Sequence, residues 1–145
     1  MTSYVSAELR RTVEQRAKRI CEYCRIHEDD TLLGCQVDHV ISEKHGGATE
    51  SDNLSYACTF CNRYKGADVG SIAASTGEFT RFFNPRTDRW PEHFTLNGVI
   101  IEPQTAIGEV TVRLFRINDP ERLIERELLA QVGRYPAPQT SDDPA

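Results

Sequence analysis

Apolar residues recur at helical spacing near the start of the chain. They stand at Leu9, Val13, Ala17 and Ile20, and most of the positions between them are charged or polar. This is the spacing of one face of an amphipathic helix. The pattern predicts a helix over residues 6–20.

Short apolar runs, separated by turn residues, follow this helix. Gly34 divides residues 31–41, which predicts two short strands on either side of it. Residues 42–50 are expected to form a loop. Ser51 or Asp52 would cap a short helical turn through Asn53, Leu54 and Ala57. A further helix is then expected to end at Gly66, a suitable residue for the end of a helix.

The second half of the chain has a different pattern. Apolar residues on both sides of Asn97-Gly98 predict a β-hairpin over residues 93–102. Ile107, Val110, Leu114 and Ile117 recur at helical spacing. Asp119-Pro120 is typical of a helix start, and that last helix is expected to end by Gly133.

These elements predict an α+β chain in three segments. Residues 1–66 are expected to form a compact core, residues 67–133 a hairpin and helix extension packed on it, and residues 134–145 a disordered tail. The composition is that of an ordinary globular protein of 145 residues, with 39% hydrophobic and 27% charged residues. No apolar run approaches the roughly 20 residues of a membrane span, and Met1–Val5 does not resemble a secretory signal. We therefore expect a cytoplasmic protein without a membrane partner.

The charge is unevenly distributed along the chain. The formal net charge is −5, yet Lys and Arg are in excess in residues 8–25, and Asp and Glu dominate residues 26–52. An acidic block with basic flanks suits a cation site that meets a nucleic-acid backbone at its rim. Solvated surface charges explain the same pattern and, on charge alone, are the favoured interpretation.

The cysteines give a sharper indication. The chain has 5 of them, and four form two pairs of the same spacing, Cys21/Cys24 and Cys58/Cys61. Two such pairs can supply the tetrahedral sulfur site that Zn²⁺ prefers. They predict one structural zinc, with two redox or free-thiol pairs as the alternative. Cys35, the odd one, is expected to be a small buried apolar residue.

Between and beside these pairs lie residues with a distinctive order. They are Val37-Asp38-His39-Val40-Ile41, Lys44-His45-Gly46-Gly47, Asp52-Asn53-Leu54 and Asn62-Arg63-Tyr64-Lys65-Gly66. Over residues 21–66 this order resembles the HNH endonuclease family. The segment from Phe83 to Phe94 also looks like a tail found on many small bacterial members.

The resemblance implies a zinc-clamped ββα-metal fold and a role for each motif residue. His39 would be the general base, Asn53 would orient its imidazole through a hydrogen bond, and Asp38 and Asn62 would hold Mg²⁺ or Mn²⁺. A neutral histidine can deprotonate water near pH 7, and a hard cation can neutralise a phosphodiester. Because neighbouring residues of a strand point to opposite faces, a bend or bulge near Asp38 and His39 is expected.

One departure from the family pattern concerns metal choice. The family name implies a second histidine where this chain has Asn62, whose amide oxygen suits Mg²⁺ better than softer ions. Four side chains near the motif are candidate nucleic-acid contacts, with solvated charges or a loop role as the alternative. They are His45, Arg63, Lys65 and Arg81.

The sequence therefore predicts a metal-dependent endonuclease that hydrolyses nucleic acid, with DNA as the favoured substrate. The alternative is a zinc-stabilised module that binds nucleic acid or protein without turnover. No separate recognition domain is visible, so either the sequence specificity is low or an unidentified partner supplies it.

Overall fold

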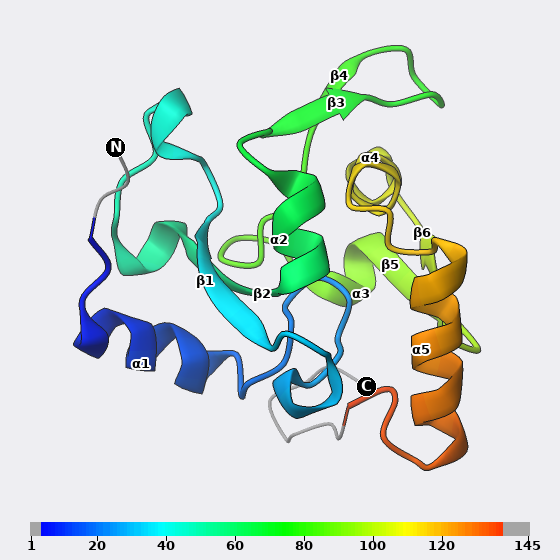
Figure 1. Cartoon of the computed structure of the whole chain (residues 1–145). Helices are drawn as coiled ribbons and strands as arrows, with labels where there is room; N and C mark the ends of the chain where they lie inside the picture. Colours follow the sequence, from blue (N-terminus) through cyan, green and yellow to red (C-terminus); the bar gives the residue numbers. More distant parts are fainter. Residues whose placement is uncertain (1–3, 138–145) are drawn as a thin grey trace.

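The computed structural model describes residues 4–137 as a mixed α+β structure with three small antiparallel sheets (Figure 1). Helix α1 (Ala7–Arg16) starts at Ser6, whose hydroxyl accepts a hydrogen bond from the Leu9 amide at 3.1 Å. Its buried face, centred on Val13, packs with Leu54 and Tyr56. The predicted helix is thus confirmed over its first turns. The chain leaves it where Lys18 and Arg19 adopt positive φ angles.

The central unit is a strand pair followed by a helix. Strand β1 (Cys35–His39) pairs with β2 (Leu54–Cys58) in a continuous antiparallel register from Cys35↔Cys58 to His39↔Leu54. Helix α2 (Thr59–Lys65) follows β2 directly and ends at Gly66, as predicted. The register runs without a break through Asp38 and His39, so the bulge expected there is not found within this strand pair.

Two predictions for this unit were wrong. The segment expected to be a short helical turn is strand β2, preceded by the 3₁₀ turn Ser51–Asn53, and residues 31–34 form a turn rather than a strand. Every residue of β2 is buried. A strand covered on both faces has no alternation of apolar and polar residues, so periodicity did not distinguish it from a helix.

Between α2 and residue 137 the chain forms two hairpins and three helices. The hairpin of β3 (Gly70–Ile72) and β4 (Phe79–Arg81) was not predicted. Helix α3 (Trp90–His93) leads into β5 (Phe94–Asn97) and β6 (Ile100–Pro103). These two strands are the predicted hairpin, and Gly98 at their turn has a φ of 62°. Helices α4 (Ala106–Leu114) and α5 (Pro120–Gln131) complete the order, and α5 begins after Asp119 as predicted.

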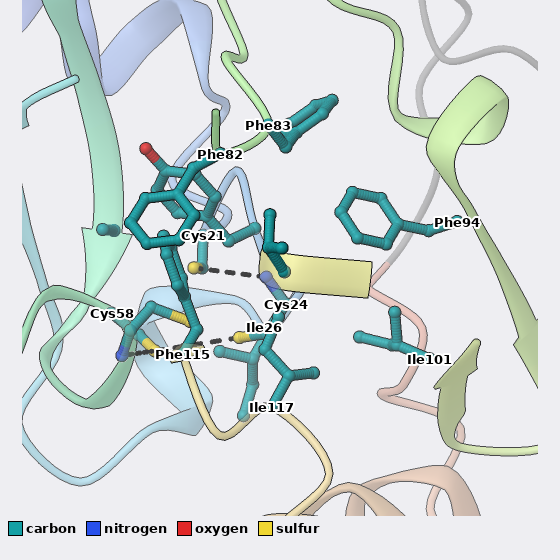
Figure 2. Packing of buried hydrophobic residues seen from close by; sticks show 14 of the residues in the cluster. Cys21, Cys24, Ile26, Cys58, Phe82, Phe83, Phe94, Ile101, Phe115 and Ile117 are labelled. Carbon is teal, nitrogen blue, oxygen red and sulfur yellow. Dashed lines mark hydrogen bonds between the residues drawn. The ribbon is translucent and has the colours of Figure 1, made fainter. Parts of the chain in front are cut away.

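One large apolar cluster joins the two halves of the chain. Figure 2 shows Cys21, Cys24 and Cys58 among aromatic and aliphatic side chains that come from beyond residue 80. The members of the cluster beyond residue 80 are Phe82, Phe83, Phe94, Ile101, Val110, Phe115 and Ile117. The cysteines are therefore part of the main core. The segment boundaries given above stay a prediction.

The chain after α5 also differs from the expectation. Tyr135 and Ala137 are buried, and the Tyr135 hydroxyl donates to the carbonyl oxygen of Cys24 at 2.7 Å. Arg134 forms an ion pair with Asp30 at 2.6 Å. Residues 134–137 are therefore ordered, because the first cysteine pair and its neighbours supply partners for them. The remainder of the expected tail, 138–145, lies outside the described residues.

None of the helices within residues 4–137 is both long enough and apolar enough to cross a membrane.

Candidate active site and metal centre

The four paired cysteines converge on one point. Their sulfur atoms all lie within 4.8 Å of one another, and all four side chains are buried. The Sγ atoms of Cys24 and Cys58 are 3.7 Å apart. Four sulfurs at about 2.3 Å from a tetrahedral Zn²⁺ would be separated by about 3.8 Å, so this donor set fits zinc in both chemistry and size.

The two cysteine pairs have the same local geometry. The Cys24 amide donates to Cys21 Sγ and the Cys61 amide donates to Cys58 Sγ, both at 3.5 Å. Such amide donors stabilise negative charge on the sulfur that accepts them. The structure therefore places all four predicted zinc ligands together and leaves Cys35, on β1, outside the group.

A guanidinium from the far end of the chain reaches this sulfur cluster. Arg122 of α5 is buried, and its Nη2 lies 3.1 Å from Cys61 Sγ and 3.7 Å from Cys58 Sγ. Its Nη1 donates to the carbonyl oxygen of Phe115 at 2.8 Å. This residue was not predicted from the sequence, because the hydrophobic pattern of α5 gives no sign that Arg122 is buried.

The segment from Phe83 to Phe94 holds the first cysteine pair from outside. Trp90 Nε1 donates to the carbonyl oxygen of Tyr23 at 2.8 Å, and Arg86 forms a short ion pair with Glu22. Both contacted residues stand between Cys21 and Cys24. Burial raises the pKa of the Glu22 carboxyl, and Arg86 acts in the opposite direction. The segment therefore braces the metal-binding turn.

Asp38 lies at the α2 side of strand β1. Lys65, at the end of α2, is buried, and its Nζ lies 3.1 Å from Asp38 Oδ2 and 2.7 Å from the carbonyl oxygen of His39. Burial raises the pKa of the Asp38 carboxyl, and the Lys65 ammonium works against that rise. Oδ2 is buried and makes no hydrogen bond of good geometry within the described residues. The Lys65 ammonium is the partner of this carboxylate in the structure, and a carboxylate oxygen is also the donor type that a hard cation prefers.

His39 is the last residue of β1, and its ring is held by a hydroxyl. Nε2 lies 2.9 Å from Oγ1 of Thr49, in the loop between the two strands. The side chain expected to hold this imidazole was that of Asn53. The structure assigns the contact to Thr49 instead, a residue that the sequence analysis did not single out.

Asn53 closes the loop that carries Thr49. Its Oδ1 accepts from the Ile41 amide at 2.9 Å, and its Nδ2 donates to the carbonyl oxygens of Ile41 at 2.9 Å and Ala48 at 2.8 Å. A Cβ at Gly47 would lie 1.7 Å from the Ile41 carbonyl oxygen, so only glycine allows this close approach. Asn53 thus acts on the loop backbone and not directly on the imidazole.

Asn62 lies on α2 opposite strand β1. Its Nδ2 donates to Oε1 of Gln36, which stands two residues before Asp38 on the same face of the strand. The amide donor is therefore occupied, and the oxygen Oδ1 is left available to a cation. Direct contact between Asn62 and Asp38 is not part of this arrangement.

A pocket of about 330 Å³ opens where these elements meet. Both Asp38 and His39 line it, together with residues of the following loop and of the chain after α2. The other lining residues are Ser42, Glu43, Lys44, Gly66 and Ala67. The pocket is accordingly bordered by the predicted base and by one predicted metal ligand.

The four candidate nucleic-acid contacts occupy different settings. Arg63 and His45 are exposed. The buried ammonium of Lys65 is occupied by Asp38 and the His39 carbonyl, so it does not reach an external phosphate. Arg81 forms a two-pronged ion pair with Asp88 at 2.7 and 3.0 Å. Lys65 and Arg81 are therefore both engaged in ion pairs within the fold, and their role as nucleic-acid contacts stays a prediction.

Comparison with known proteins agrees with this geometry. The family model described as HNH endonuclease matches residues 21–68, a segment that contains both cysteine pairs, β1, β2 and α2. This segment of the chain is therefore similar to HNH endonucleases. Searches of curated proteins and of solved structures gave no match for the chain.

Proposed function

We propose that the protein is a metal-dependent endonuclease that hydrolyses phosphodiester bonds, with DNA as the favoured substrate. The observation that carries this proposal is the shared pocket of Asp38 and His39 within a segment that matches the HNH family. Two cations close in sequence to the motifs can meet a phosphate backbone. They are Lys44, which lines the pocket, and Arg63, which is exposed.

Each site residue has a defined role in this proposal. His39 accepts the proton of the attacking water, because a neutral imidazole is a competent base near pH 7. Asp38 and Asn62 would hold Mg²⁺ or Mn²⁺ through oxygen atoms. A carboxylate oxygen of Asp38, which here faces the Lys65 ammonium, and the amide oxygen of Asn62 are the donor types that such an ion prefers. When bound, the ion would neutralise the phosphate and the leaving oxygen.

The four-cysteine site has a structural role. Four thiolates fill the coordination sphere of Zn²⁺ and leave no open position for a water or a substrate. The first cysteine pair precedes Asp38 and His39 in the chain and the second pair follows them, so zinc would fix both ends of the segment that carries these two pocket residues.

A cleavage assay tests the proposal. We expect the zinc-loaded full chain to cut plasmid DNA with Mg²⁺ or Mn²⁺ and to stop when EDTA is added. His39→Ala should lower the rate by roughly 100-fold or more, the typical effect of losing a general base. DNA binding should persist in this variant.

The same assay separates the alternative. A folded wild-type protein that binds nucleic acid but cuts neither DNA nor RNA with any divalent ion would identify a binding module. Equal cleavage by His39→Ala and wild type, in preparations cleared of contaminating nuclease, would also contradict the proposal.

A further inference from the structure

Within residues 4–137, the His39 ring makes a side-chain hydrogen bond to one group, a threonine hydroxyl. Thr49 Oγ1 lies 2.9 Å from Nε2, a normal hydrogen-bond distance. No other described residue hydrogen-bonds the second ring nitrogen, Nδ1. The two nitrogens of this imidazole are therefore in different environments.

A threonine hydroxyl can accept a proton from Nε2 or donate one to it, so the contact by itself is compatible with either tautomer. We propose that Thr49 is the positioning residue of the base: its hydroxyl oxygen accepts the Nε2 proton of His39 and so keeps Nδ1 unprotonated as the atom that takes the proton from water. This inference rests on the proposed nuclease function and deepens it. In neutral imidazole only one nitrogen carries a proton, so fixing that proton on Nε2 leaves a lone pair on Nδ1.

The position of Thr49 is itself determined by its loop. Asn53 ties the loop at Ile41 and Ala48, and Ala48 is the residue directly before Thr49. Gly47 passes so close to the Ile41 carbonyl that a side chain would force the loop open. Strand pairing also continues past β1, because the Val40 amide donates to the Asn53 carbonyl at 2.8 Å. Asn53 therefore acts on the imidazole indirectly, through the loop and Thr49.

Three variants of the full chain test this inference. Thr49→Val keeps the shape of the side chain but removes the hydroxyl, and Thr49→Ser keeps the hydroxyl but removes the methyl group. Thr95→Val is the matched control, because Thr95 lies exposed on β5, in a strand pair away from the loop. Zinc content and circular dichroism check that each variant folds. If Thr49→Val does not fold, Thr49→Ala is used in its place.

The first measurement reads the tautomer without any need for activity. Long-range ¹H–¹⁵N correlation of ¹⁵N-histidine protein shows which nitrogen of each of the 4 histidines is protonated, and the signals lost in His39→Ala identify that ring. We expect protonated Nε2 in the wild type, Thr49→Ser and Thr95→Val, and a shift to a mixture of tautomers in Thr49→Val. A protonated Nδ1 in the wild type, or an unchanged ring in Thr49→Val, would overturn the inference.

The second measurement is single-turnover cleavage of DNA. We expect Thr49→Val to be slower by roughly 10- to 100-fold at unchanged DNA affinity, because a misplaced base loses rate and not binding. Thr49→Ser should stay within a few-fold of wild type. Equal losses in Thr49→Ser and Thr49→Val would overturn the inference. If the wild type does not cut at all, the proposed function fails, while the tautomer measurement still decides the role of Thr49.

Discussion

Arg122 Nη2 lies 3.1 Å from Cys61 Sγ, so a buried cation from the last helix contacts the sulfur cluster formed by the first half of the chain. Four thiolates around Zn²⁺ carry an excess of negative charge, and burying that charge in a core is costly unless it is paired. Arg122 supplies the pairing charge. The segment that matches the HNH family and the segment after it thus share one metal centre.

This contact predicts that Arg122 slows zinc loss. Arg122→Met should release zinc to a chromogenic chelator at least several-fold faster than wild type, because its thiolates lose a charged donor. Arg126→Met is the matched control, since Arg126 is equally buried one turn further along α5 but binds the carbonyls of Val99 and Ile117. Equal release rates in the two variants would show that Arg122 acts on general stability only.

Removal of one zinc ligand should affect more than the matched segment. The purified protein should contain about one zinc per chain, and Cys58→Ser should lose it. Because the cysteines lie in one cluster with Phe94 and Ile101 from the second half, both halves should lose structure. Metal analysis and near-ultraviolet circular dichroism measure this. Cys35→Ser, outside the cluster of four, should keep its zinc. A Cys58→Ser protein with full zinc content would contradict the assignment.

We expect Lys65 to contribute to stability and Arg63 to contribute to DNA binding. Lys65→Met leaves the Asp38 carboxylate buried without its partner, which should lower the free energy of unfolding by about 3 kcal/mol. The double variant with Asp38→Asn should recover much of this loss. Arg63→Gln should leave stability unchanged and weaken DNA binding. Urea unfolding and a DNA-binding titration measure the two effects. A stable Lys65→Met protein with weakened binding would restore Lys65 as a phosphate contact.

Arg81 should contribute to stability in a pH-dependent way. Its hydrogen bonds hold the pKa of Asp88 below the usual range, so the pair stabilises the fold above the ordinary carboxyl pKa and ceases to do so as the pH falls through the lowered value. Arg81→Gln should cost about 0.5–1 kcal/mol at pH 7, because the arginine is half exposed. NMR titration should show a higher Asp88 pKa in this variant. Altered DNA affinity would instead identify Arg81 as a phosphate contact.

Much of the fold could be predicted because single residues set local geometry. Each of these signals is contained in a few neighbouring residues. Examples are the two cysteine pairs, the turn at Asn97-Gly98 and the helix start at Asp119-Pro120. Strand β2 could not be predicted, since its burial on both faces depends on elements distant in sequence.

The orientation of helix α5 could not be predicted from the sequence either. Arg122 and Arg126 point inward, whereas Ile124 and Leu128 are exposed. The hydrophobic pattern alone favours the opposite orientation. Sulfur atoms and backbone carbonyls that accept the guanidinium protons determine the observed one. Thr49 was missed for a related reason, because its role arises only when the loop folds back onto His39.

Helix α2 has 7 residues, starts directly after Cys58 and ends at Lys65. At a rise of 1.5 Å per residue, the helix therefore fixes a distance of about 10 Å along its axis between Cys58, a sulfur ligand, and Lys65, the partner of Asp38. One inserted residue would turn the end of the helix by about 100° and carry Lys65 away from the strand. The chain length from Cys61 to Lys65 is thus as constrained as the identity of either residue.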